Sequence, residues 1–142
     1  FQLASFTVTT YALPGHTLGA VAYEINNIYL FTGDTLFSLG CGRLFEGTPD
    51  QMFQSLQIIK SFPDHWRMYC GHEYTLKNLA FASQLDPRSE TLKTHALWAK
   101  AQRDQQRPTM PTTLGQEKAM NPFLRADSLE TFTRLRRERD RF

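Results

Sequence analysis

The sequence predicts an α/β protein in which a β-rich first half, residues 1–73, is followed by an all-helical second half, residues 74–142. Two observations carry this prediction. β-Branched and aromatic residues gather in short runs up to Cys70, whereas from Tyr74 onward apolar residues recur at the spacing of an α-helix. The 142 residues, 41% of them hydrophobic, are enough for a packed core.

The first half should contain three strands before its first helix. Residues 6–12 and 20–25 are rich in β-formers, and Asn26 and Asn27 are typical of a hairpin turn. Residues 28–31 then have the composition of a buried strand.

The first helix has clear start signals. Thr48 is the expected N-cap, Pro49 suits the first helical position, and Gln51 completes a capping box. Its apolar side should carry Met52, Phe53, Leu56 and Ile59. A short strand over residues 67–70 then leads to a glycine and a histidine.

The second half should hold three helices and one connector. Helices are expected over about 74–85 and 89–106, and a last one capped by Asp127 and Glu130. Residues 107–115 contain two prolines, which predict an ordered connector or a short helical turn. The expected buried residues are Leu76, Leu79, Ala80 and Leu85, then Leu92, Ala96, Trp98 and Ala99, and finally Leu129, Phe132 and Leu135.

Composition limits the function classes. The net charge of +2 comes from the tail 134–142, so a broad nucleic-acid surface is not predicted. No apolar run reaches the roughly 20 residues that span a bilayer, and the start lacks the pattern of a signal peptide. Two cysteines that are too few for a disulfide scaffold favour a reduced, cytoplasmic setting. Phe1 is not expected to be the natural first residue.

Three polar residues stand out because each directly follows a glycine at or just after a predicted strand end. They are His16 in PGHTLG, Asp34 in TGDT and His72 in CGHEYT. Imidazole nitrogen and carboxylate oxygen are ligands for zinc, iron or manganese, and a carboxylate can bridge two cations. The alternative for each residue alone is structural, since an Asp after a strand commonly caps a turn. The sequence therefore predicts a metal site while leaving the turn interpretation open.

These motifs resemble glyoxalase II, the hydroxyacylglutathione hydrolase family of the metallo-β-lactamase superfamily. The likeness runs through FTGDTLFSLGCGRLFEGTPDQM, CGHEYTLKNLAFA, NPFLR and the terminal RRERDRF, and so covers essentially the whole chain. It implies the second half of a metallo-β-lactamase αββα sandwich over residues 1–73. Residues 74–142 would form an all-helical, glutathione-binding C-terminal domain.

The resemblance also implies site residues. His16, Asp34 and His72 would be metal ligands for two divalent ions, zinc before iron or manganese, with Asp34 bridging them; no catalytic residue beyond these ligands is implied. The residues expected to contact the glutathione thioester are Arg43, Leu44, Phe45, Tyr74, Arg136 and Arg139. Phe45 stands where some members carry Tyr, and Ala20 where the family usually has His.

Structural alternatives exist for some of these residues. Arg136 and Arg139 lie three apart on one helix face, and cations near a helix C-terminus also complement its dipole. Cys41 and Cys70 flank the site but have no paired base, so both are expected to be packing residues rather than nucleophiles.

One family motif is missing. The remaining four metal ligands come from T-H-x-H-x-D-H, and this sequence contains no H-x-H, so three of seven ligands would remain. The sheet should then expose an apolar face that the missing half would cover.

One interpretation is an incomplete copy of a thioesterase that cleaves S-(D-lactoyl)glutathione, monomeric when complete, with no nucleic-acid or membrane partner. The other is a non-catalytic module that binds glutathione conjugates or a complementing partner. A relative such as a persulfide dioxygenase is disfavoured by the GCGR and NPFLR segments.

Overall fold

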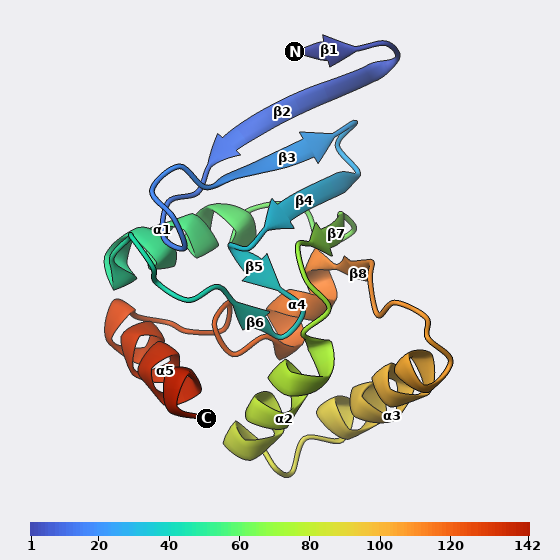
Figure 1. Cartoon of the computed structure of the whole chain (residues 1–142), viewed down its shortest axis with the longest axis vertical. Helices are drawn as coiled ribbons and strands as arrows, with labels where there is room; N and C mark the ends of the chain where they lie inside the picture. The colour runs from blue at the N-terminus through green and yellow to red at the C-terminus, as the bar shows by residue number, and fades with distance from the viewer.

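The computed structural model describes residues 1–142 and contains one main sheet with helices packed against one of its faces (Figure 1). Its six strands are ordered β1-β2-β3-β4-β7-β8, and every neighbouring pair is antiparallel except the parallel pair β4–β7. Their bounds are β1 Gln2–Leu3, β2 Phe6–Ala12, β3 Val21–Ile25, β4 Tyr29–Gly33, β7 Arg67–Cys70 and β8 Thr112–Thr113. A separate hairpin pairs β5 Leu36–Phe37 with β6 Gly40–Cys41. The helices are α1 Pro49–Lys60, α2 Thr75–Leu85, α3 Glu90–Asp104, α4 Leu114–Met120 and α5 Leu129–Arg141.

The predicted strands and helix of the first half are present as β2, β3, β4, α1 and β7, but the structure also contains β1 and the β5–β6 hairpin, which the sequence did not predict. Asn26 and Asn27 both take positive φ in the turn between β3 and β4. Thr48 caps α1, and its capping box with Gln51 is formed in both directions. Met52, Leu56 and Ile59 are buried, as the helical spacing predicted, and Phe53 packs against the same core from its edge.

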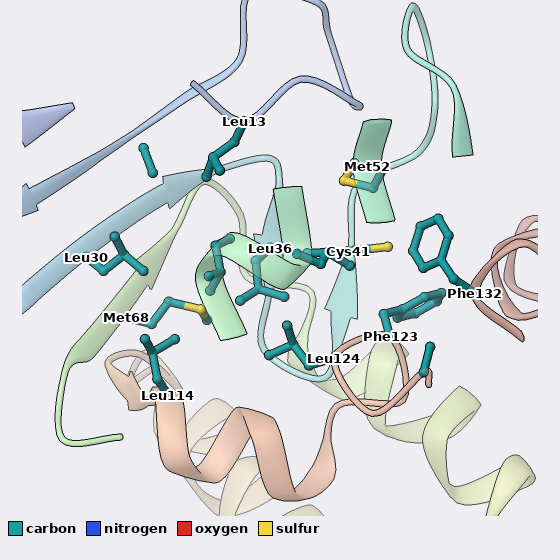
Figure 2. Close-up of a cluster of buried hydrophobic side chains, with 14 of the residues drawn as sticks. Leu13, Leu30, Leu36, Cys41, Met52, Met68, Leu114, Phe123, Leu124 and Phe132 are labelled. Carbon is teal, nitrogen blue, oxygen red and sulfur yellow. The ribbon is translucent and has the colours of Figure 1, made fainter. Parts of the chain in front are cut away.

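The main core lies between the sheet and the helices (Figure 2). Leu30 of β4, Met68 of β7, Met52 of α1 and Leu114 of α4 belong to this one cluster, and all four are fully buried. Phe123 and Phe132 extend the same cluster to the chain beyond α4 and to α5. Burying such side chains contributes about 1.5–3 kcal/mol each, so this cluster binds the helical half to the sheet.

The opposite face of the sheet carries aromatic residues that are partly open to solvent. Tyr23 of β3 pairs with Phe31 of β4, and these two side chains are 44% and 39% exposed. Phe31 stacks on Tyr69 of β7 with ring centroids 5.0 Å apart. The sequence-based expectation of an exposed apolar face therefore matches this surface, whereas what covers it stays a prediction.

The second half is helical as predicted, but three details were wrong. The buried side of α2 carries Thr75, Asn78, Leu79, Phe81 and Ala82, whereas the predicted Leu76, Ala80 and Leu85 are exposed. Trp98 of α3 is 41% exposed and Leu129 of α5 is 37% exposed. The N-cap of α5 is Ser128, which accepts a hydrogen bond from the Thr131 backbone, rather than Asp127.

The segment predicted as a connector, residues 107–115, holds β8 and the start of α4, so the second half has four helices rather than the three predicted. Thr112 and Thr113 form β8, which pairs with β7 at the edge of the sheet, and Thr113 caps α4 with a second capping box. The proposed division of the chain after residue 73 stays a prediction. None of the five helices is both long enough and apolar enough to cross a membrane.

Candidate functional site

A hollow of about 430 Å³ opens where the loops after β4, β6 and β7 meet α2 and α5. Its lining includes eight of the nine residues predicted from the sequence: His16, Asp34, Arg43, Phe45, His72, Tyr74, Arg136 and Arg139. The ninth, Leu44, does not line it and packs instead against the main core. Residues up to 123 positions apart in the sequence thus meet in one place.

The carboxylate of Asp34 lies between two imidazoles. Its Oδ2 is 3.3 Å from Nε2 of His72 and 3.6 Å from Nε2 of His16. Gly33 turns the chain here with a φ of +52°, in the left-handed region that favours glycine. A Cβ on Gly71 would collide with Oδ1 of Asp34, so glycine at this position gives the carboxylate its space.

The ring of His16 is oriented by its second nitrogen. Nδ1 lies 2.8 Å from the carbonyl oxygen of Arg43, which can only accept, so Nδ1 carries the proton. In the neutral ring Nε2 then keeps its lone pair and faces Asp34. A backbone carbonyl on the far nitrogen is the usual way in which proteins orient a metal-binding histidine.

The three side chains are of the donor types that bind zinc, but they do not complete a site. Zinc sites use imidazole nitrogen and carboxylate oxygen, and here one carboxylate oxygen approaches two such nitrogens. Across residues 1–142, however, no group of three or more His, Cys, Asp or Glu side chains is arranged to hold a metal ion alone. The chain therefore offers a partial donor set.

Aromatic rings form the wall beside these donors. Tyr74 stacks on His72 with centroids 5.0 Å apart, and Phe37 meets the edge of Tyr74 at 5.1 Å. Phe45, which is 69% exposed, lies 4.8 Å from the ring of His16. Both imidazoles are thus flanked on one side by an apolar ring, which limits the directions from which a ligand can approach.

Arg136 lines the hollow, but the protein already uses its guanidinium. The residue is 4% exposed, and Nη1 donates to the Cys41 carbonyl at 2.8 Å. Nη2 donates to Oδ1 of Asp140 at 2.9 Å, and the guanidinium lies over the Phe123 ring. Arg136 therefore joins α5 to the end of β6, which is a structural role beside any contact with a substrate.

Arg139 and Arg43 present positive charge more openly. Nη2 of Arg139 donates to Oδ1 of Asn78 at 3.3 Å, while Arg43 keeps 64% of its side chain exposed. Partial burial, followed by the charges of Arg136 and Arg43, lowers the pKa of Arg139. Neighbouring cations of this kind favour an anionic ligand, because a carboxylate would relieve their mutual repulsion.

Five lining residues were not among the predicted site residues: Phe37, Cys41, Gly42, Lys77 and Asn78. Lys77 follows Tyr74 by three positions, a spacing that places both on one helix face, so this signal was available. Asn78 and Phe37 had no comparable signal, because each reaches the hollow through the packing of α2 against the β5–β6 hairpin.

A family model described as "Hydroxyacylglutathione hydrolase C-terminus" matches residues 73–142. A hydroxyacylglutathione hydrolase of Shewanella pealeana is 54% identical over 118 residues, covering 83% of this chain and 44% of that protein. The chain belongs to the hydroxyacylglutathione hydrolase family. It spans about half the length of the curated family members that it matches.

Solved structures show the fold of this hydroxyacylglutathione hydrolase family member. The crystal structure of ETHE1 from Myxococcus xanthus matches with a TM-score of 0.67 at 23% identity, covering 96% of this chain and 48% of that one. A metallo-beta-lactamase from Staphylococcus aureus matches with a TM-score of 0.65 at 21% identity, covering 93% and 34%. The predicted metallo-β-lactamase fold class with a helical C-terminal part is thereby confirmed.

Proposed function

We propose that this chain is the substrate-binding portion, with part of the metal-binding portion, of a thioester hydrolase. The hydrolase would convert an S-2-hydroxyacylglutathione, S-(D-lactoyl)glutathione foremost, into glutathione and a 2-hydroxy acid. One observation carries the proposal: a single hollow holds the Asp34–imidazole cluster and the Arg43–Arg139 pair. A thioester of glutathione has matching ends, a reactive carbonyl and free carboxylates.

The proposed roles follow from the chemistry of each side chain. His16, Asp34 and His72 would hold part of a centre of two divalent ions, zinc before iron or manganese. Such ions polarise a carbonyl and make water acidic enough to supply a nucleophile near neutral pH. Arg139 and Arg43 would pair with glutathione carboxylates, and Tyr74 would lie along the peptide.

The structure supports smaller roles in glutathione binding for Arg136 and Leu44 than the sequence analysis expected. The bonds of Arg136 to Cys41 and Asp140 support a role in shaping the hollow, so its direct contact with glutathione would be secondary to that of Arg139. Leu44 could contribute through its backbone alone, because its side chain packs against the core.

The test is hydrolysis of S-(D-lactoyl)glutathione by the polypeptide purified from its source, together with its intact mass and metal content. We expect activity from a longer polypeptide. The Asp34→Ala variant of that polypeptide should lose metal, and its kcat/KM should fall by about 100-fold or more. The matched variant Asp50→Ala, at an exposed position of α1, should keep both. Full activity of Asp34→Ala would refute the metal role.

The second candidate is a non-catalytic module that binds glutathione conjugates or a complementing partner. The partial donor set and the exposed aromatic face of the sheet favour it. A natural polypeptide of this length that binds glutathione without hydrolysing the thioester would decide for the module. Hydrolysis by the source polypeptide would decide against it.

A further inference from the structure

The turn between β5 and β6 is held by polar side chains from the helical half. Leu39 lies in this turn with a φ of +58°, a left-handed backbone conformation that residues other than glycine seldom adopt. Its backbone N–H donates to Oε2 of Glu117 in α4 at 2.8 Å. The neighbouring carbonyl of Ser38 accepts from Nδ2 of Asn78 in α2 at 2.9 Å. A backbone conformation that is unfavourable by itself is thus fixed from outside.

Asn121, just after α4, completes the same contact. Its Nδ2 lies 3.1 Å from the carbonyl oxygens of both Phe37 and Gly40, and 3.1 Å from Oε2 of Glu117. Each of the four residues of the turn, 37–40, therefore has a backbone group bonded to α2, α4 or the residue after α4. We call Asn78, Glu117 and Asn121 the turn clamp.

Glu117 is a costly residue for this position. It is 0% exposed, and its Oε1 has no hydrogen-bond partner. Burial raises the pKa of its carboxyl, while the N–H of Leu39 and the amide of Asn121 act in the opposite direction. An apolar side chain would fill the space without this penalty. The geometry that its bonds impose on the turn offers a reason for the acid.

The turn controls two parts of the hollow. On one side lies Phe37, whose ring touches both Tyr74 and His72. On the other side β6 ends at Cys41, and the chain continues through Gly42 to Arg43, whose carbonyl orients the ring of His16. A shift of the turn would therefore move the aromatic wall and Arg43 together.

We infer that Glu117 is a positioning residue for the substrate site, acting through the turn clamp on Phe37 and Arg43. Glu117 does not line the hollow and touches none of the residues assigned to the ligand. The effect of Glu117 depends on the length of its side chain, because Oε2 must come within hydrogen-bonding distance of the Leu39 N–H. This inference rests on the proposed function, in which the hollow takes glutathione.

The test compares two variants of the 142-residue chain that separate length from charge. Glu117→Asp keeps the charge but is one methylene shorter, so it cannot reach Leu39 without movement of α4 or the turn. Glu117→Gln keeps the length, and its amide oxygen can accept the same bonds. Glu130→Asp, at an exposed position of α5, is the matched control. Hydrogen exchange of the Leu39 amide reports on the turn, and titration with reduced glutathione reports on the site.

We expect Glu117→Asp to speed exchange at Leu39, to shift the amide resonances of Phe37 and Arg43, and to weaken glutathione binding about tenfold. Glu117→Gln and Glu130→Asp should stay within about twofold of the parent chain. The inference is overturned if Glu117→Asp leaves exchange and affinity unchanged, or if Glu117→Gln loses as much as Glu117→Asp.

The two proposals can fail separately. If the parent chain does not bind glutathione, the proposed function loses its support, and the resonances of Phe37 and Arg43 still report whether Glu117 sets the turn. If glutathione binds equally well while those resonances move, the positioning role alone is refuted.

Discussion

The two ends of the hollow differ in how much of their bonding capacity the protein itself uses. At one end Asp34 meets the two imidazoles, and His72 keeps 50% of its side chain exposed. At the other end Arg136 is bonded to Cys41 and Asp140 and is almost fully buried. The difference shows that residues lining the same cavity can have different roles. The open end leaves bonds for a ligand, whereas the closed end holds the cavity together.

The largest expected effect would come from removing the closed end. Arg136→Ala leaves the Cys41 carbonyl without its charged donor and opens space beside Phe123. We expect the free energy of unfolding, measured with urea, to fall by about 3 kcal/mol. Arg137→Ala, on the exposed side of the same helix, should change it by less than about 0.5 kcal/mol. Equal stabilities of the two variants would mean that Arg136 is free to bind a ligand.

A second change tests how firmly the open end is held. In Gly71→Ala the new Cβ would meet Oδ1 of Asp34, so either the carboxylate or the loop after β7 must move. We expect a loss of about 2 kcal/mol in the free energy of unfolding, in the range of other overpacking substitutions. The control is Gly19→Ala, where no atom lies within 4 Å of the new Cβ. If both variants are equally stable, Asp34 moves freely and its place between the imidazoles is not enforced.

Arg139 stands between these extremes, since it is partly buried and bonded only to Asn78 among the polar side chains. Arg139→Ala should weaken the binding of reduced glutathione about fivefold, as expected for the loss of one charge-assisted bond at a solvated site. Calorimetric titration of the chain provides the measurement, with Arg137→Ala as the control. An unchanged affinity would mean that Arg139, like Arg136, has a structural role and does not bind glutathione.

The smallest expected effect concerns Cys41 at the closed end. Burial raises the pKa of this thiol to about 11, against the opposing effect of Arg136. At pH 8 only about one molecule in a thousand would carry the thiolate, which is the form that alkylating reagents attack. Mass spectrometry after treatment with iodoacetamide should therefore find Cys41 unmodified while the chain is folded, and modified in urea. Rapid modification of the folded chain would contradict the packing role.

Residues with strong local signals were predicted from the sequence alone. Thr48 and Gln51 form a capping box from side chains that are close in the sequence, so no tertiary information was needed. The same holds for the turn at Asn26 and Asn27, since asparagine tolerates positive φ better than most residues. His16, Asp34 and His72 line one hollow, and each follows a glycine, a pattern that the sequence also displayed.

Residues whose role depends on distant partners could not be predicted in this way. Leu39 takes a positive φ that its own chemistry disfavours, because Glu117 and Asn78 hold the turn from other elements. The buried side of α2 was assigned wrongly at Leu76, Ala80 and Leu85, although Leu79 is buried as predicted, and the reason is related. Thr75 and Asn78 are buried to make hydrogen bonds, so apolar periodicity pointed to the other side of the helix.

The strand β8 has a consequence for how this molecule can be divided. Thr112 and Thr113 come from the helical half, yet their backbone pairs with β7 and forms the outer edge of the sheet. Removing residues 74–142 would strip that edge and leave the backbone of β7 unpaired on one side. The helical half therefore cannot be replaced on its own. A chimaera that takes residues 74–142 from a relative would also need a β7 that pairs with the β8 of that relative.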